Sequence, residues 1–364
     1  MPKKGNSKRT MDLQQRINAF TALGQFLSQF SSEKTLKNDA IQGNDLFFER
    51  MSQQLDTAVH HNGWFTRENI QFALKSWGKA LSEENIKKWL SKYPIPKKTN
   101  LKTIAIIMAG NIPLVGFHDF LSVLITGNTA LVKLSSNDSQ LLPLISEYLI
   151  GIEPSFKQHI KITNKKLENF DAVIATGSDN TARYFDYYFG KYPHIIRKNR
   201  NAVAVLTGKE TPEQLNALAN DVFRYFGLGC RNVSKVFLPE DYNFDPLFNG
   251  MFSWKHMINN NKYINNYDYN KAVYLMSNLD LLDNEFLLLK EDSGYSSPIS
   301  VLFYEKYKDL SEIKQKLKSE AEHIQVIVSD SGIKEEVPFG AAQKPQLWDY
   351  ADGVDTVDFL LKLP

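Results

Sequence analysis

The sequence has almost no cysteine, and it lacks both a metal-binding motif and an excess of charge of one sign. A single cysteine cannot form an internal disulfide, and no Cys/His spacing typical of a metal site occurs, so we expect no metal and a reducing compartment. The formal net charge is +2, from 43 basic and 41 acidic residues. This balance offers no electrostatic footprint for nucleic acid, which we do not expect as a partner.

Long apolar runs are also missing. The most apolar stretch, 103–127, contains Asn111, Pro113, His118 and Asp119, so it stops short of the roughly 20 apolar residues that a bilayer requires. The basic start of the chain is followed by an amphipathic helical pattern rather than by the apolar core of a secretion signal. We therefore expect a cytoplasmic protein with no membrane span.

The 364 residues exceed the usual size of one hydrophobic core, and 43% of them are apolar, which predicts two packed domains. Apolar residues from Leu13 to Phe30 recur every three or four positions, as in a helix with one buried face. Thr66 and Ser82 are candidate caps of further helices. Residues 1–93 are therefore predicted to form a helical N-terminal layer, which ends at the connector YPIPKKTN.

After residue 100 the pattern changes to short β-branched runs separated by helical lengths, which predicts a parallel sheet with crossover helices. The expected strands are 103–109, 129–134, 171–176 and 202–206. In such α/β folds ligands bind at the carboxyl ends of the strands, here just after Ala109, Leu134 and Thr176. We predict a Rossmann-type dinucleotide domain over 94–207, a second α/β domain over 208–335 that begins its strands at 233–239, and a C-terminal tail over 336–364.

Cys230 follows a glycine-flanked turn, GLGCRN, and precedes the strand at 233–239. Two interpretations stay open from the residues alone. The side chain is either a small buried hydrophobe, or a nucleophile whose thiolate is favoured by Arg231 and by peptide N–H groups of the turn.

Four ordered segments carry a resemblance to the aldehyde dehydrogenase superfamily. The first, AGNIPLVGFHDFLSVLITGNTALVKLSSND (109–138), contains an Asn-x-Pro turn, a helix, Gly-Asn-Thr and a strand ending in lysine. The second, ATGS (175–178), resembles the family's phosphate-approach turn, and the third, GLGCRNVSKVFLP (227–239), resembles its nucleophile loop and the following strand. The fourth, PFGAAQKPQLWDYADGVDT (338–356), resembles its closing segment. Within the superfamily the single cysteine and the ending LWDYADGVDTVDFL are most similar to the LuxC-type fatty acyl-CoA reductases. The resemblance implies an aldehyde-dehydrogenase-like fold and NADPH-dependent reduction of an acyl-CoA or acyl thioester to the aldehyde.

The resemblance also implies roles for individual residues. Cys230 would be the nucleophile and Asn111 the oxyanion donor. Residues expected to bind the cofactor lie at the ends of the expected strands 129–134 and 171–176 and, through an alignment that needs a gap, at 291; they are Lys133, Ser135, Ser136, Gly177, Ser178 and Glu291.

Two absences refine the expected chemistry. The family often has a glutamate shortly after the lysine that reaches the adenosine ribose, whereas here no carboxylate follows Lys133 until Asp138, which favours NADPH over NADH. Hydrolytic members use a glutamate base to activate water, and the matching stretch here has no Asp or Glu between Asp186 and Glu210. An acyl-enzyme should therefore react slowly with water.

Two alternatives remain open. One is a CoA-acylating aldehyde dehydrogenase working in the oxidative direction with the same residues, and the other is a non-catalytic acyl- or nucleotide-binding relative. The expected substrate is an acyl-CoA or acyl-protein thioester, with an acyl-transferase or acyl-protein synthetase as a further candidate partner and a homo-oligomer as the expected assembly.

Overall fold

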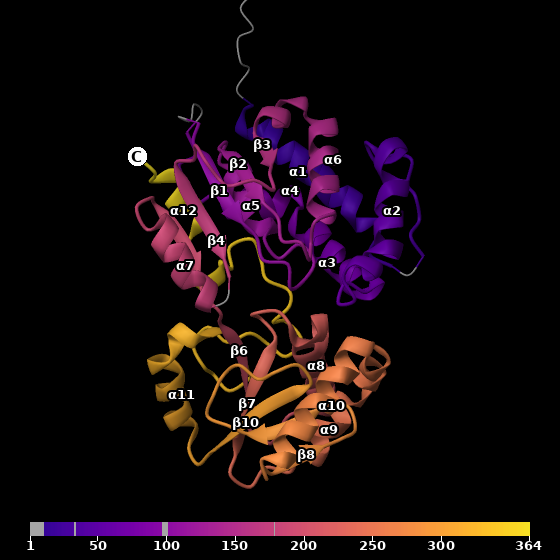
Figure 1. Cartoon of the computed structure of the whole chain (residues 1–364), viewed down its shortest axis with the longest axis vertical. Helices are drawn as coiled ribbons and strands as arrows, with labels where there is room; N and C mark the ends of the chain where they lie inside the picture. Colours follow the sequence, from indigo (N-terminus) through magenta and orange to yellow (C-terminus); the bar gives the residue numbers. More distant parts are fainter. Residues whose placement is uncertain (1–10, 33, 97–100, 178) are drawn as a thin grey trace, which may run out of the picture. The chain divides into compact units, whose positions relative to one another are not determined.

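The computed structural model describes residues 11–32, 34–96, 101–177 and 179–364. The chain forms two compact units (Figure 1). The first runs to Lys198 and includes Gln346–Pro364, and the second is Asn199–Pro345. The chain therefore passes from one unit to the other after Lys198, before the expected boundary at 207, and returns after Pro345.

Helices make up the amino-terminal part of the first unit, as predicted. They are α1 (Leu13–Ser28), α2 (Asn44–His61), α3 (Arg67–Ala80) and α4 (Glu83–Leu90). Side-chain oxygens of Asp12, Thr66 and Ser82 cap three of them by accepting the backbone N–H three residues on. The apolar stripe of α1 is buried, so this layer is held by packing against the rest of the unit.

The sheet of the first unit is parallel, with strand order β3-β2-β1-β4-β5, which is the classic dinucleotide-binding order 3-2-1-4-5-6 without its last strand. Its elements, in chain order, are β1 (Thr103–Ile107), α5 (Phe117–Ile125), β2 (Thr129–Lys133), α6 (Leu141–Ile152), η1 (Pro154–Gln158), β3 (Ile160–Ile162), β4 (Ala172–Thr176), α7 (Asp179–Phe189) and β5 (His194–Arg197). The sequence pattern had not indicated β3 and β5, because runs this short carry little periodicity.

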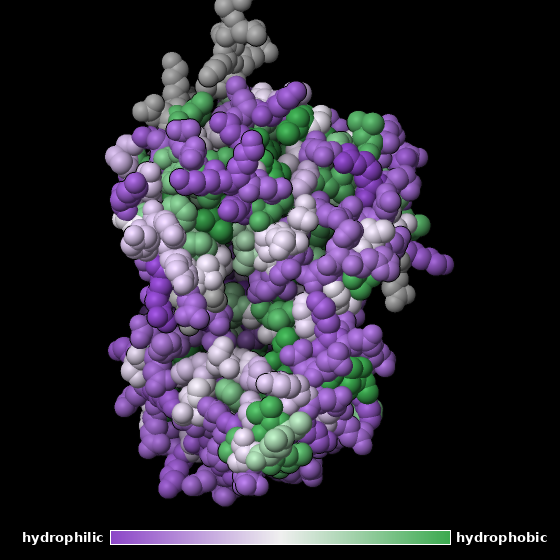
Figure 2. Space-filling model, viewed as in Figure 1, coloured by the Kyte–Doolittle hydropathy of each residue, from purple (hydrophilic) through white to green (hydrophobic). Residues whose placement is uncertain are grey.

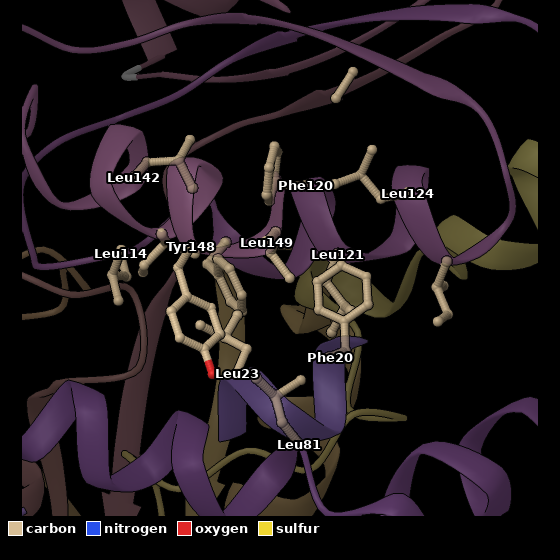
Figure 3. Packing of buried hydrophobic residues seen from close by; sticks show 14 of the residues in the cluster. Phe20, Leu23, Leu81, Leu114, Phe120, Leu121, Leu124, Leu142, Tyr148 and Leu149 are labelled. Atoms are coloured by element: carbon tan, nitrogen blue, oxygen red, sulfur yellow. The ribbon is translucent and has the colours of Figure 1, made fainter. Parts of the chain in front are cut away.

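One core joins the helical layer to this sheet. Figure 3 shows Phe20 and Leu23 of α1 on the same side of α5 as Leu121 and beside Tyr148 of α6, and these four side chains are fully buried. Burial of a large apolar side chain contributes about 1.5–3 kcal/mol. The helical layer therefore fixes α5, the helix that follows the first strand.

The second unit holds a separate sheet of order β11-β6-β7-β10-β9-β8, parallel except for the β8–β9 pair. Its elements are β6 (Asn201–Val205), α8 (Pro212–Phe223), η2 (Arg224–Gly227), β7 (Val233–Pro239), α9 (Asp245–Met251), η3 (Phe252–Asn259), α10 (Asn261–Met276), β8 (Leu281–Asp283), β9 (Leu288–Glu291), β10 (Val301–Tyr307), α11 (Leu310–Ser319), η4 (Ala321–His323) and β11 (Ile324–Val328). The strand expected at 202–206 exists as β6, but it pairs with β7 and β11 here and not with the first sheet.

The carboxyl-terminal segment, with η5 (Ala351–Gly353) and α12 (Thr356–Leu361), belongs to the first unit. Leu347, Val357 and Leu360 share the buried core of α1, α5 and α6. The segment is drawn in yellow beside the first unit in Figure 1.

The observed architecture is thus α/β with parallel sheets and a helical amino-terminal region, which confirms the expected fold class. Hydrophilic residues cover most of the surface that is visible in Figure 2. Among the described residues, no helix has the length and apolar character needed to cross a membrane.

Candidate active site

Cys230 lies in the turn between η2 and β7, at the amino end of β7, and it is half-buried. The chain enters this turn through an unusual backbone. Tyr225, Phe226 and Gly227 have φ angles of 55°, 58° and 76°, a left-handed conformation that costs energy for the two aromatic residues and none for glycine. The packing around them must hold this conformation, since both aromatic side chains are buried.

Asn232 holds the cysteine turn from inside. Its side-chain nitrogen donates to the carbonyl oxygens of Asp221, Val222 and Arg224, at 3.1, 3.2 and 2.6 Å, and its side-chain oxygen accepts from the backbone N–H of Gly229 at 2.8 Å. This buried amide thus links the end of α8 to the residue before Cys230. The sequence pattern did not indicate a role for Asn232, because its burial and its partners are visible only in the structure.

The closing segment around 338–344 is fastened to the same turn. The carboxylate of Asp221, on α8, accepts from the backbone N–H groups of Gly340 and Ala342 at 2.6 and 3.1 Å. Arg231 Nε donates to the carbonyl oxygen of Ala342 at 2.5 Å. Burial raises the pKa of Asp221 to about 7, against the opposing effect of the two N–H donors. Segments far apart in sequence therefore meet beside Cys230.

A third segment, the loop 292–300, is tied to the first residues of β7. Ser234 Oγ donates to the carbonyl oxygen of Tyr295 at 2.6 Å, and Lys235 Nζ donates to that of Ser293 at 2.8 Å. The buried Lys235 ammonium is also paired with Glu305 at 2.6 Å. Because buried charge is costly unless it is paired, this arrangement holds the loop close to the amino end of β7.

Glu291 lies elsewhere in the second unit. It ends β9, opposite Tyr304 of β10 and level with Val236 of β7, and its exposed carboxylate is hydrogen-bonded to the Tyr304 side chain. Cys230 precedes the amino end of β7, whereas Glu291 is at the carboxyl end of its strand. The structure therefore does not place these two residues at the same edge of the sheet, and a cofactor role for Glu291 stays a prediction.

The other predicted site residues belong to the first unit, where β1, β2 and β4 are neighbours with their carboxyl ends at one edge. Asn111 follows β1, Lys133 ends β2, Ser135 and Ser136 follow β2, and Gly177 follows β4. All but the exposed Ser136 are half-buried, and Ser178 lies outside the described residues. The structure thus gathers the predicted cofactor residues, apart from Glu291, at the edge where α/β folds bind nucleotides.

Close approach of the backbone explains one glycine in this group. A Cβ on Gly110 would lie 2.5 Å from Ser135 Oγ, so only glycine allows the loop after β1 to contact the loop after β2. The hydroxyl of Ser135 accepts from the backbone N–H of Asn137 at 3.2 Å. The turn that carries Asn111 is therefore in contact with the loop that carries the predicted ribose-binding residues.

Asp138 completes this contact. Its carboxylate accepts from the backbone N–H of Leu114 at 2.9 Å, and Leu114 has a φ of 58° in the turn after Asn111. Burial raises the pKa of Asp138 to about 6, while the backbone donors Leu114 and Leu141 oppose the shift. The carboxylate is therefore occupied by the turn, a role that its position before α6 did not reveal.

No group of three or more His, Cys, Asp or Glu side chains that could hold a metal ion occurs in the part of the chain that the structure describes. The polar groups next to Cys230 in its turn are instead the Arg231 side chain and backbone amides. They suit covalent chemistry on a carbonyl group, in which a thiolate attacks and hydrogen-bond donors meet the developing charge.

Comparison with known proteins agrees with this geometry. Residues 9–246 match the family model described as Acyl-CoA reductase (LuxC). The search of curated protein sequences gave no significant match.

Solved aldehyde dehydrogenases have similar structures. Aldehyde dehydrogenase 21 from Physcomitrella patens, in complex with the reaction product succinate, has a TM-score of 0.67 at 13% identity, covering 98% of this chain and 85% of its own. The indole-3-acetaldehyde dehydrogenase AldA of P. syringae, a mutant in complex with NAD+ and IAA, has a TM-score of 0.59 at 12% identity over 88% and 73%. KauB from Pseudomonas aeruginosa has a TM-score of 0.59 at 11% identity over 88% and 77%. These likenesses confirm the aldehyde-dehydrogenase-like fold.

Proposed function

Because the chain belongs to the acyl-CoA reductase (LuxC) family, we propose that it reduces an acyl-CoA thioester to the aldehyde with NADPH, through an acyl-enzyme on Cys230. Family membership supports chemistry at the thioester and aldehyde level. The observation that carries the acyl-enzyme is the position of Cys230, the one cysteine of the sequence, in a half-buried turn that Asn232 and Arg231 tie to the surrounding backbone.

In the proposed reaction the Cys230 thiolate attacks the thioester carbonyl, and the CoA thiolate leaves. NADPH supplies the hydride that converts the acyl group to the aldehyde level. The resulting tetrahedral adduct collapses, the bond to Sγ breaks, and the aldehyde leaves with Cys230 regenerated. The sum is acyl-CoA, NADPH and a proton giving aldehyde, CoA and NADP+, so atoms and electrons balance.

Asn111 is proposed to donate its side-chain amide to the carbonyl oxygen as negative charge develops there. One such donor is typically worth about 2.7–4 kcal/mol of barrier lowering. Its support is a half-buried position in a turn that is held by Asp138 through Leu114. A turn restrained in this way can hold a donor in advance of the reaction.

The proposed cofactor site is the edge after β1, β2 and β4, with Lys133, Ser135, Ser136 and Gly177 as the described contacts. NADPH is favoured because Lys133 can pair with a 2′-phosphate, and because Asp138, the first carboxylate after it, is engaged by Leu114. A carboxylate in this position that was free to face the ribose would repel that phosphate. This supports the choice of NADPH over NADH.

The test is an NADPH-oxidation assay across acyl-CoA chain lengths with wild type and Cys230→Ala. We expect the variant to keep its circular dichroism spectrum and to lose reductase activity by at least three orders of magnitude, because the covalent path is removed. Ser253→Ala, an exposed serine of the same unit bonded to Asn216, is the matched control and should keep wild-type activity. Retained activity in Cys230→Ala would reject the acyl-enzyme.

A further inference from the structure

Two buried polar side chains of the first unit lack the partners that burial normally requires. They are Arg16, on α1, and His159, the residue before β3, with 4% and 3% of their area exposed. Arg16 Nε and both ring nitrogens of His159 are buried without a hydrogen-bond partner among the described residues. Buried polar atoms are normally hydrogen-bonded, and a fully buried arginine is normally paired. The fold therefore places unused donors at this point.

Packing between α1 and the segment before β3 brings the two side chains together. Phe20, one turn after Arg16, packs edge to face on Phe156 of η1, with ring centroids 5.8 Å apart. The backbone carbonyl of His159 accepts from the Ala130 N–H at 2.8 Å, which fixes His159 beside β2. The charge of Arg16 is close enough to act on the His159 ring. Both side chains therefore lie in one small region at the amino end of β3.

The carboxylates near this region are engaged elsewhere. Asp12 caps α1 by accepting from the Gln15 N–H at 2.8 Å. Glu153 accepts from the Ser155 N–H at 3.1 Å and from the Gln15 side chain at 3.4 Å. Asp12 acts on Arg16 through its charge, without a hydrogen bond between the two. Helix capping thus uses the acceptors that could have bound the guanidinium.

The net charge of the region is set by Arg16. Burial lowers the pKa of Arg16 to about 10, with the charge of Asp12 opposing the shift, so the guanidinium stays charged at neutral pH. Burial and the charge of Arg16 lower the pKa of His159, while the nearby carbonyl of Asn128 opposes this effect. His159 is therefore a neutral imidazole near pH 7, with one N–H to donate. A guanidinium beside an imidazole N–H suits an oxyanion.

We propose that Arg16 and His159 form a binding site for a small oxyanion with the chemistry of inorganic phosphate. The planar guanidinium donates to two oxygens of the ion, and the His159 ring donates to a third. Because both side chains are almost fully buried, the site takes a free ion rather than the phosphate of a bulky ester. The bound ion links α1 to the sheet and stabilises the helical layer.

This site is separate from the proposed cofactor site. His159 precedes β3 in a parallel sheet, so it lies at the amino ends of the strands, whereas the proposed cofactor residues follow the carboxyl ends. The inference therefore goes beyond the proposed function and does not depend on it.

Thermal unfolding in sodium phosphate, compared with sodium chloride of equal ionic strength, is the main test. At about five times the Kd of phosphate, the Tm of wild type should rise by about 2–4 °C more than that of Arg16→Met. This variant keeps an apolar side chain and removes a buried charge, so in chloride it should be at least as stable as wild type. Arg50→Met, at an exposed arginine of α2 paired with Glu147, is the control and should respond to phosphate as wild type does.

Calorimetric titration with phosphate tests the role of each donor. Arg16→Lys keeps the charge without the planar fork, and His159→Phe removes the ring donor, so each should weaken binding by about tenfold. Phenyl phosphate should bind wild type at least about tenfold more weakly than inorganic phosphate. Equal binding of the two would overturn the free ion in favour of a phosphate ester.

The His159 ring gives a readout that depends on no variant. In NMR titrations of wild type, phosphate should raise the pKa of His159, because an adjacent anion favours the imidazolium. Unchanged titration of His159, or a Tm that responds to phosphate equally in wild type and Arg16→Met, would overturn the site.

Discussion

Replacement of Asn232 tests the structural basis of the cysteine turn. Asn232→Ala removes an acceptor for the Gly229 N–H and the donors to three carbonyl oxygens at the end of α8. The two shortest bonds, 2.6 and 2.8 Å, contribute about 1 kcal/mol each, and a buried N–H left without a partner costs about 1–3 kcal/mol. We therefore expect the free energy of unfolding to fall by about 3 kcal/mol.

The assay is urea unfolding followed by circular dichroism, together with the rate of Cys230 alkylation in the folded protein. Asn216→Ala is the control, because Asn216 lies on α8, whose end Asn232 contacts, with an exposed side chain bonded to Ser253, and it should change stability by less than about 0.5 kcal/mol. Asn232→Asp should be worse than alanine, since a carboxylate would face three carbonyl oxygens. An Asn232→Ala protein as stable as wild type, with unchanged alkylation, would show that the turn does not depend on this amide.

Three other predictions concern the cofactor, the acyl-enzyme and pH. Lys133→Ala, which removes a charge-assisted bond to the 2′-phosphate, and Ser136→Glu, which adds a carboxylate that repels it, should each lower the ratio of kcat/KM for NADPH to that for NADH by about tenfold. Lys161→Ala on β3 should leave the ratio unchanged. A wild type that prefers NADH would contradict the reasoning. With acyl-CoA and no NADPH, a covalent acyl adduct should accumulate on the Cys230 peptide in mass spectrometry. The stretch 187–209, where hydrolytic relatives are expected to carry the base that speeds hydrolysis about 10²–10⁴-fold, contains no Asp or Glu. Rapid release of free fatty acid would contradict this prediction. Burial raises the pKa of Asp138 to about 6, so the folded state binds this proton more tightly than the unfolded state. The free energy of unfolding of wild type relative to Asp138→Asn should therefore fall by up to about 3 kcal/mol as the pH rises from about 4 to about 6. Urea titrations that give a constant difference across this pH range would refute the prediction.

Local pattern determined much of the fold. The helical period of α1, the capping residues Thr66 and Ser82, and the β-branched runs of β1, β2 and β4 appear in the structure where the sequence predicts them. Each depends on interactions within a few residues or on one buried face, and both leave a periodic trace in sequence. The placement of Asn111, Lys133 and Gly177 at the carboxyl ends of three neighbouring strands follows from the same pattern, since parallel neighbours share an edge.

Other features were decided only by tertiary structure. Whether β6 joined the first sheet or the second depended on its partners β7 and β11, which periodicity cannot identify. The contacts of Asp221 with Gly340, of Arg231 with Ala342 and of His118 with Leu347 join residues more than a hundred positions apart. A hydrogen bond leaves no mark in the sequence around either partner. The sequence by itself therefore determined most of the helices and strands and named the candidate residues for the chemistry, because both follow from local pattern. Long-range packing decided which sheet each strand entered and what holds the cysteine turn in place.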